Sequence, residues 1–450
     1  MKQPHSIALS ITIELEGRVL KVGDLKWSRD DRRAAFEYDA AALNARLALS
    51  PFRMKLAPGV IMASPHPFEG LHGLFADSLP DGWGRLLVDR QVSRNGGNPA
   101  IMTPLDRLAI VGANGMGALS YAPAYDITDD APKRALKLDW FATQAENILA
   151  GQSDDGISKL LEASGGSAGA RPKIMALKNL DTKKFSLDTG AIAKKNQEHW
   201  LIKLKHRKEG LDIGRIENAY AQMARAAQIQ FPDTQLIEDK NGNAHFAVKR
   251  FDRTPLGRLH VHTLAGMVNA DFRMPSLDYT DLLEVVASLS PDQNQVKEAF
   301  RRMVFNVIAG NRDDHAKNHA FTMDATGKWQ LSPAYDVTPS DGPGGEHNMT
   351  VANEGRAPGQ SHFAKVAASA GLQQHDANTI ISEVAEAISS WKHHADANKI
   401  KNAEAIAIGK LIESNANAAL GLKGAFLKSA APKPPTKPRP KNSGKGGRGD

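Results

Sequence analysis

The chain has 450 residues, of which 41% are hydrophobic and 24% are charged, values that are typical of a folded protein and exclude a disordered or fibrous one. Cysteine is absent, which excludes disulfides, thiolate metal sites and a cysteine nucleophile. The net charge of +7 suggests an anionic partner, but five of those charges lie in the last segment, 429–450.

The length predicts two or three domains, and the first of them covers residues 1–125. Short alternating runs there, SIALSITIEL and AAFEYDA, predict strands. The motif SLPDGWGRLL then predicts a turn followed by a helix. The N-terminus lacks a signal-peptide pattern and no apolar run is long enough to cross a bilayer, so we expect a cytoplasmic protein without a membrane partner.

The second domain is predicted over 126–255, with its boundary in 126–136. A helical stretch leads into the loop SGGSAGARPK at 164–173, and the strands KIMALKN and HWLIKLKHR follow. Apolar side chains recur every three or four positions over 212–229, which predicts a helix with one buried face. The run LIEDKNGNAHFAVKRFD reads as a hairpin that turns at Asn-Gly.

The third domain is predicted over 256–428 and is mostly helical. DQNQVKEAFRRMVFNVIAGN predicts a helix that ends at Gly310, and two further helices are expected over 375–427. A strand-rich half therefore precedes a helix-rich half, which predicts an α+β fold with two lobes. The segment 429–450 is rich in Pro, Lys and Gly, so we expect a disordered tail that is solubilising or binds phosphate weakly, with a specific nucleic-acid arm as the alternative.

A polar loop, GNRDDHAKNHAF at residues 310–321, is set between two apolar runs. His315 and His319 stand four apart, like zinc ligands on a helix, but Ala316 occupies the place where a zinc protease needs glutamate. A solvated turn is a second interpretation. A third comes from the spacing, because Asp313 is followed five residues later by an asparagine and then by a short hairpin.

The hairpin AFTMDATGKWQL returns the chain almost to where it left, so Asp336 is expected near Asn318. An Asp, an Asn five residues on, a hairpin and a second Asp is the layout used for phosphoryl transfer from ATP. In that layout Asp313 accepts the hydroxyl proton, while Asn318 and Asp336 offer hard oxygen ligands to Mg²⁺. We favour this interpretation.

A phosphoryl-transfer site also needs a lysine on a strand and a glutamate on the next helix. The strand WLIKLK offers Lys203 and Lys205, of which Lys203 lies nearer the middle of the apolar run, and the helix that follows carries Glu217. The loop before the first strand supplies small residues with Arg171 and Lys173 for charge. It is neither a Walker A nor a GxGxxG sequence.

These motifs together resemble the HipA family of serine/threonine-kinase toxins. The resemblance is carried by GNRDDHAKNHAF and SPAYDVTPS with GARPK, IKL, RFDR and SLPDGWGRLL, in order over about residues 60–340. It implies a two-lobed, protein-kinase-like fold with an additional N-terminal subdomain. It also implies that the GARPK residues bind ATP, namely Gly169, Ala170, Arg171 and Lys173.

The resemblance further implies roles for single residues. Asp313 would be the catalytic base, Asn318 and Asp336 would bind Mg²⁺, and Lys203, fixed by Glu217, would contact the ATP phosphates. His315 would brace the catalytic loop by hydrogen bonding, and Lys317 would lie near the transferred phosphate. The hinge facing adenine would be formed by Lys249, Arg250 and Phe251, where the family's best-known member has an acidic residue in place of Lys249.

Members of this family phosphorylate a serine of an aminoacyl-tRNA synthetase and so arrest growth, and a helix-turn-helix antitoxin restrains them. The resemblance therefore implies ATP, Mg²⁺, a protein substrate and an antitoxin partner, with DNA bound only through the antitoxin. Members also phosphorylate a serine in their own glycine-rich loop. That position is Gly166 here, flanked by Ser164 and Ser167 as candidate sites. A small-molecule kinase, or an inactive ATP-binding co-repressor, are the alternative functions.

Overall fold

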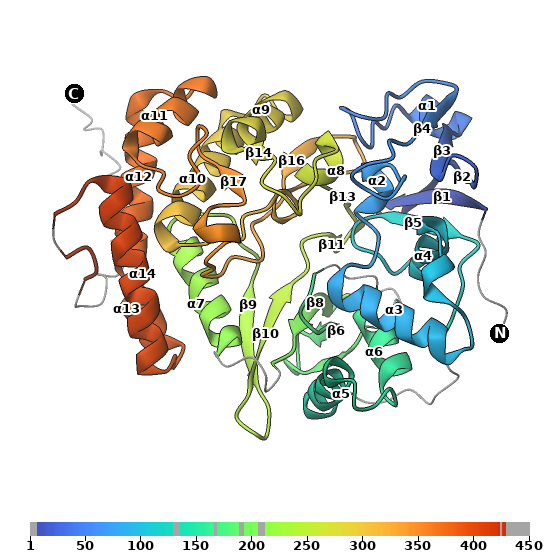
Figure 1. The fold of residues 1–450 in the computed structure, drawn as a ribbon, viewed down its shortest axis with the longest axis horizontal. Helices are drawn as coiled ribbons and strands as arrows, with labels where there is room; N and C mark the ends of the chain where they lie inside the picture. Colours follow the sequence, from blue (N-terminus) through green and yellow to red (C-terminus); the bar gives the residue numbers. More distant parts are fainter. Residues whose placement is uncertain are drawn as a thin grey trace, which may run out of the picture.

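The computed structural model describes residues 7–128, 136–165, 169–188, 193–205, 212–423 and 425–428. Candidate Ser167 and the basic tail lie outside these residues, as does most of the expected boundary segment. The N-terminal sheet lies at one end of the molecule and the last helices lie at the other, with a second sheet between and below them (Figure 1).

The N-terminal unit is built around a five-stranded antiparallel sheet in the order β4-β3-β2-β1-β5. Its first strand alternates as predicted, with Leu9, Ile11, Ile13 and Leu15 buried on one face. The elements are β1 (Ala8–Leu15), β2 (Arg18–Ser28), β3 (Arg33–Tyr38), α1 (Ala40–Ala45), β4 (Val60–Met62), α2 (Gly73–Ala76), α3 (Gly82–Arg94), a 3-10 helix (Pro99–Ile101), α4 (Pro104–Val111) and β5 (Leu119–Ala122).

The second sheet has five antiparallel strands in the order β7-β6-β8-β10-β9. Its register places Lys173, Lys203 and Phe246 side by side on one face. The other face packs on α3, α5 and α6. The elements are α5 (Leu138–Ala150), α6 (Ile157–Ser164), β6 (Lys173–Asn179), β7 (Phe185–Leu187), β8 (Gln197–Lys203), α7 (Ile213–Ala226), β9 (Thr234–Glu238) and β10 (Ala244–Lys249).

The rest of the chain is mainly helical, with short paired strands. These elements are β11 (Arg253–Thr254), β12 (Gly257–Arg258), β13 (His260–Thr263), α8 (Leu264–Val268), β14 (Leu277–Asp278), α9 (Tyr279–Leu289), α10 (Gln293–Ala309), a 3-10 helix (Ala316–Asn318), β15 (Ala320–Met323), β16 (Trp329–Leu331), a 3-10 helix (Pro343–Gly345), β17 (Met349–Thr350), α11 (Gln360–Ser369), α12 (Gln374–Ser389), α13 (Trp391–Ala397) and α14 (Asn402–Leu420).

Two features of this helical lobe were predicted correctly and one was not. Gly310 ends α10 in the left-handed conformation, and Met323 pairs with Trp329 in the predicted hairpin. The expectation of two helices over 375–427 was wrong, because α12, α13 and α14 occupy that range. Lys399, in the left-handed region with φ of 55°, lies in the break between α13 and α14.

The buried side chains form two large clusters. One runs without interruption from the N-terminal sheet through α7 into the helical lobe. The other lies between the second sheet and α3, α5 and α6. Because α3 belongs to the N-terminal unit, that unit packs against both lobes and not only against its sequence neighbour. Among the described residues, no helix is long and apolar enough to span a bilayer.

Candidate active site

The loop after α10 is anchored by a buried carboxylate that the sequence analysis did not single out. Asp314 is fully buried and accepts hydrogen bonds from the Tyr279 hydroxyl at 2.8 Å and from the Asn348 amide at 2.9 Å. His347 Nδ1 lies 2.9 Å from Oδ2, the oxygen that also accepts from Tyr279. Burial alone raises the pKa of Asp314, but His347 and Tyr279 outweigh it and keep the pKa below its usual range. The sequence did carry a signal for this residue, because two acidic residues, Asp313 and Asp314, stand side by side in the loop. Asp314 is the structural member of that pair.

The other member of that pair points away from the protein interior. The Asp313 side chain is 57% exposed, and His315 Nε2 lies 3.9 Å from its Oδ1. Desolvation raises the pKa of Asp313, the Asp336 and Asp314 carboxylates raise it further, and His315 opposes them. An accessible carboxylate with a raised pKa is suited to accept a proton.

The rest of the loop is held mostly through its backbone. The Asn318 amide side chain donates to the Asp313 carbonyl at 2.8 Å, which leaves its Oδ1 for another partner. The Tyr335 hydroxyl donates to the Lys317 carbonyl at 2.5 Å, so the hairpin does return the chain to this loop. His315 forms a hydrogen bond within the loop through its backbone. Its carbonyl accepts from the Asn318 amide at 2.8 Å, whereas its ring packs on Phe272 with 5.8 Å between ring centroids.

The predicted lysine–glutamate pair is present at the end of β8. Lys203 Nζ lies 2.5 Å from Glu217 Oε1 and 2.5 Å from Asp336 Oδ1. Arg171 reaches the second oxygen of Glu217 at 2.7 Å. Burial lowers the pKa of Lys203, but the two carboxylates outweigh it and raise the pKa overall. The end of β8, helix α7, the segment after the hairpin and the loop before β6 thus bring four charged groups together.

Asp336 itself has an unusual backbone and an open side chain. Its φ is 55°, in the left-handed region that is rare for residues other than glycine and is often found at functional sites. The side chain is 44% exposed. Desolvation raises its pKa, but Lys203 and Lys173 lower it well below the usual range, so the carboxylate is ionised.

The loop before β6 brings a second lysine to the same place. Gly169 has φ of +97°, which favours glycine, and a Cβ there would lie 2.5 Å from Lys173 Nζ and would displace this ammonium. Burial lowers the pKa of Lys173 to about 8, and the positive charge of Lys203 contributes. Ser164 is buried, and its hydroxyl donates to the Lys173 carbonyl at 2.8 Å, which argues against its candidacy as a phosphate acceptor in this conformation.

The predicted hinge uses its charged side chains for structure. Lys249 pairs with Glu198 at 2.6 Å. Arg250 is buried and its side chain donates two hydrogen bonds to Asp252, at 2.9 and 2.7 Å, so a contribution of Arg250 to the adenine hinge would come from its backbone. The Phe251 ring lies 5.7 Å from the Tyr335 ring, which places it beside the residue that precedes Asp336.

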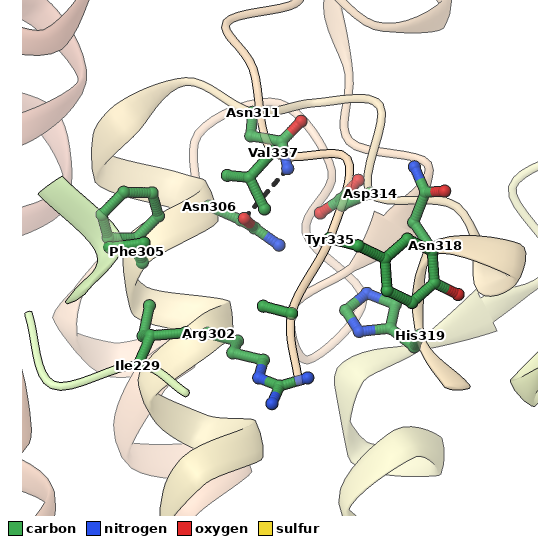
Figure 2. A pocket seen from close by; sticks show the side chains of 12 residues that line it. Ile229, Arg302, Phe305, Asn306, Asn311, Asp314, Asn318, His319, Tyr335 and Val337 are labelled. Carbon is green, nitrogen blue, oxygen red and sulfur yellow. Dashed lines mark hydrogen bonds between the residues drawn. The ribbon is translucent and has the colours of Figure 1, made fainter. Parts of the chain in front are cut away.

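A small cavity lies behind the loop that follows α10 (Figure 2). Its volume is about 20 Å³, enough for one water molecule. Polar side chains of α10 and of the loop line it, and Asn311 Nδ2 donates to Asn306 Oδ1 at 3.0 Å across its wall (Figure 2). Both ring nitrogens of His319 are buried without a hydrogen-bond partner among the described residues. The cavity behind the loop is thus lined on one part by polar groups and on the other by apolar side chains such as Ile229, Phe305 and Val337.

The donor set fits a hard divalent cation. Among the described residues, no group of three or more His, Asp or Glu side chains is placed to hold a metal ion. Mg²⁺, however, is commonly bound through one or two carboxylates together with substrate phosphates. The ionised Asp336 and the free carbonyl oxygen of Asn318 supply the protein's share of such a site.

Comparison with known proteins places these features in a family. A model of the HipA N-terminal domain matches residues 13–122, and a model of the HipA-like C-terminal domain matches residues 165–392. The protein Y4dM of Sinorhizobium fredii, described as a candidate kinase, is 31% identical over 154 residues, which cover 31% of this chain and 36% of that protein. The matched region thus spans about a third of that relative.

A solved structure shares the fold. The Shewanella oneidensis HipA, solved in complex with HipB and its operator DNA, superimposes with a TM-score of 0.66 at 15% sequence identity. The likeness covers 91% of this chain and 97% of that one. These matches confirm the predicted α+β fold, two-lobed and kinase-like with an additional N-terminal subdomain.

Proposed function

The chain belongs to the HipA family, and from that premise we propose that it is an ATP-dependent serine/threonine protein kinase acting as the toxin of a type II toxin–antitoxin system. The observation that supports this most is the open Asp313 carboxylate beside the Lys203–Glu217–Asp336 cluster. A protein that bound ATP only for structure would have no need of an accessible proton acceptor.

In the proposed reaction, a serine or threonine hydroxyl of the substrate protein lies at Asp313. The new bond forms between that hydroxyl oxygen and the terminal phosphorus of ATP, while the bond from phosphorus to the bridging oxygen breaks and ADP leaves. The hydroxyl proton passes to Asp313. Lys203 and Lys173 hold the phosphates, and Glu217 fixes Lys203 through the 2.5 Å contact.

Mg²⁺, when bound by Asn318 and Asp336, supplies positive charge at the phosphates. The positive charge of Lys203 on Asp336 keeps the pKa of this carboxylate low, so that it is ionised and ready for a cation. Phe251 and the neighbouring backbone would face the adenine.

The partners follow from the family. The Shewanella structure contains HipB and operator DNA, so we propose a helix-turn-helix antitoxin as the partner of this chain, with DNA bound through it. The proposed substrate is a serine of a translation component such as an aminoacyl-tRNA synthetase, and the proposed compartment is the cytoplasm. We retain the predicted domains, 1–125, 126–255, 256–428 and the tail, as proposals.

The test uses labelled ATP, Mg²⁺ and a cell lysate with three purified proteins: the native chain, Asp313→Asn and Asp341→Asn. Asp341 is an exposed carboxylate of the same lobe, outside the proposed site, and is the matched control. We expect a labelled protein band with the native chain and the control but none with Asp313→Asn. Label that passes a protein filter would indicate a small-molecule kinase. Tight ATP binding by calorimetry without turnover would indicate a co-repressor.

A further inference from the structure

Three consecutive residues of the N-terminal subdomain, Asp81, Gly82 and Trp83, reach into the proposed active site. They form the start of α3, in the SLPDGWGRLL motif. Asp81 Oδ2 lies 3.1 Å from Lys317 Nζ on the catalytic loop. The Trp83 amide donates to the Gly169 carbonyl on the glycine-rich loop at 3.1 Å. One short turn thus touches both loops that would enclose the phosphates.

The contact with the glycine-rich loop is backbone against backbone. Gly82 has φ of +39°, and a Cβ there would lie 2.7 Å from Ala170 Cα and 3.0 Å from the Gly169 carbonyl oxygen. Any side chain would push the two loops apart. The Trp83 indole also donates to Ser164 Oγ at 3.2 Å, and the Ser164 hydroxyl in turn donates to the Lys173 carbonyl. The turn is therefore fixed relative to the phosphate-binding loop.

The contact with the catalytic loop restrains the position of the Lys317 ammonium. The Lys317 side chain is only 14% exposed, and its ammonium lies over the Phe272 ring, 4.1 Å from the centroid. Desolvation raises the pKa of Asp81, but Lys317 and Arg273 outweigh it and lower the pKa overall, so the carboxylate is ionised. A lysine side chain is long and flexible, and a carboxylate at its tip together with an aromatic face restricts where the ammonium can lie.

We propose that Asp81 is a positioning residue for Lys317, so that the N-terminal subdomain completes the phosphate site with a charge supplied from outside both kinase lobes. This inference rests on the proposed function, because it takes Lys317 to contact the transferred phosphate. A displacement of about 1 Å at such a group can cost roughly 100-fold in rate. The ammonium would act mainly on the transferring group, so the loss is expected in kcat more than in KM for ATP.

The test is Asp81→Asn, because asparagine still caps a helix and so preserves the start of α3 while removing the charge. We expect kcat to fall roughly 10- to 100-fold, with KM for ATP changing less than about threefold and the melting temperature unchanged. Glu69→Gln is the matched control. It removes another carboxylate of this subdomain, one paired with Arg85 of α3 at 3.0 Å and half exposed, and should leave the rate as it is.

A double-mutant cycle separates positioning from a general structural role. If Asp81 acts through Lys317, adding Asp81→Asn to Lys317→Met lowers kcat no further. Equal losses in both backgrounds would overturn the proposal. So would tighter ATP binding with undiminished kcat in Asp81→Asn, which would make the carboxylate a competitor of the phosphates.

A measurement without turnover keeps this inference separate from the proposed function. The probe is an acyl phosphate of ATP, whose acyl group is transferred to an amine that lies at the phosphates and releases ATP. We expect peptide mass spectrometry to find label on Lys317, reduced about tenfold in Asp81→Asn relative to label on Lys203. A native chain that is labelled but transfers no phosphate would overturn the kinase proposal alone. A native chain without label at Lys317 would overturn the positioning role.

Discussion

One buried carboxylate of this molecule, Asp252, contrasts with the two carboxylates of the proposed active site, Asp313 and Asp336. At the junction of the two sheets, Asp252 is fully buried and every contact of its side chain is short. Arg250 donates to both its oxygens, Arg253 pairs with it at 2.7 Å, and the Gly117 amide donates to it at 2.8 Å. Burial raises the pKa of Asp252, but the two guanidinium groups outweigh it and lower the pKa.

At the proposed active site, Asp313 and Asp336 have side chains that are 57% and 44% exposed. The His315 ring lies 3.9 Å from Asp313, and the pKa of Asp313 is raised where that of Asp252 is lowered. A carboxylate whose hydrogen-bonding capacity is filled holds the fold together, and one left partly open is available to a ligand. This contrast predicts that the two groups respond to mutation in different assays.

The largest effect is expected at the open carboxylate. Asp313→Asn removes the proposed proton acceptor and should lower the rate of phosphate transfer about 10²- to 10⁴-fold, while the free energy of unfolding stays within about 0.5 kcal/mol. Steady-state kinetics measure the rate, and denaturant unfolding of the same samples measures the free energy of unfolding. A variant that loses rate only because it has unfolded would remove the contrast with Asp252.

The second largest effect is a loss of stability at Asp252, the carboxylate whose hydrogen-bonding capacity is filled. Asp252→Asn leaves Arg250 and Arg253 buried without a counter-charge, which should lower the free energy of unfolding by about 3–5 kcal/mol. Denaturant unfolding measures it. The control is Glu346→Gln, which breaks an exposed pair with Arg356 at 3.1 Å and should cost at most about 1 kcal/mol. Equal costs at the two positions would contradict this assignment.

A pH profile sharpens the role of Lys173. Its pKa is lowered to about 8 by burial, so the ammonium loses its proton as the pH rises through 8. If this charge binds the phosphates, kcat/KM for ATP should fall above pH 8, by at most about tenfold per pH unit. Lys173→Arg keeps its charge throughout this range and should flatten that limb. If kcat/KM falls above pH 8 in this variant as it does in the native chain, the titrating group is not Lys173.

The smallest effect is expected at Ser164. Its hydroxyl bridges the Trp83 indole and the Lys173 carbonyl, so Ser164→Ala should lower the free energy of unfolding by about 1 kcal/mol. Because the hydroxyl is buried, the same variant should incorporate as much phosphate into itself as the native chain, measured with labelled ATP. Loss of that label would show that this loop opens during the reaction.

Much of the site was predictable because its parts are local. The 3- and 4-residue spacing fixed which face of α7 is buried, and Glu217 follows Lys203 by only 14 positions, across one strand-to-helix connection. The short hairpin β15–β16 returns the chain by its own geometry, which brings Tyr335 to the carbonyl of Lys317. The left-handed end of α10 at Gly310 is equally a property of nearby residues.

What the sequence by itself determined was therefore the order, type and local pairing of the elements, and through them the Lys203–Glu217 pair and the return of the hairpin to the loop of Lys317. Tertiary structure alone decided which carboxylate of the acidic pair is buried, that Asp252 is held by Arg250, Arg253 and the Gly117 amide, and that Asp81 meets Lys317 from 236 positions away. Patterns with the period of a helix or strand report only which side of an element is buried. Contacts between distant segments depend on how whole subdomains pack, and no local periodicity records that packing.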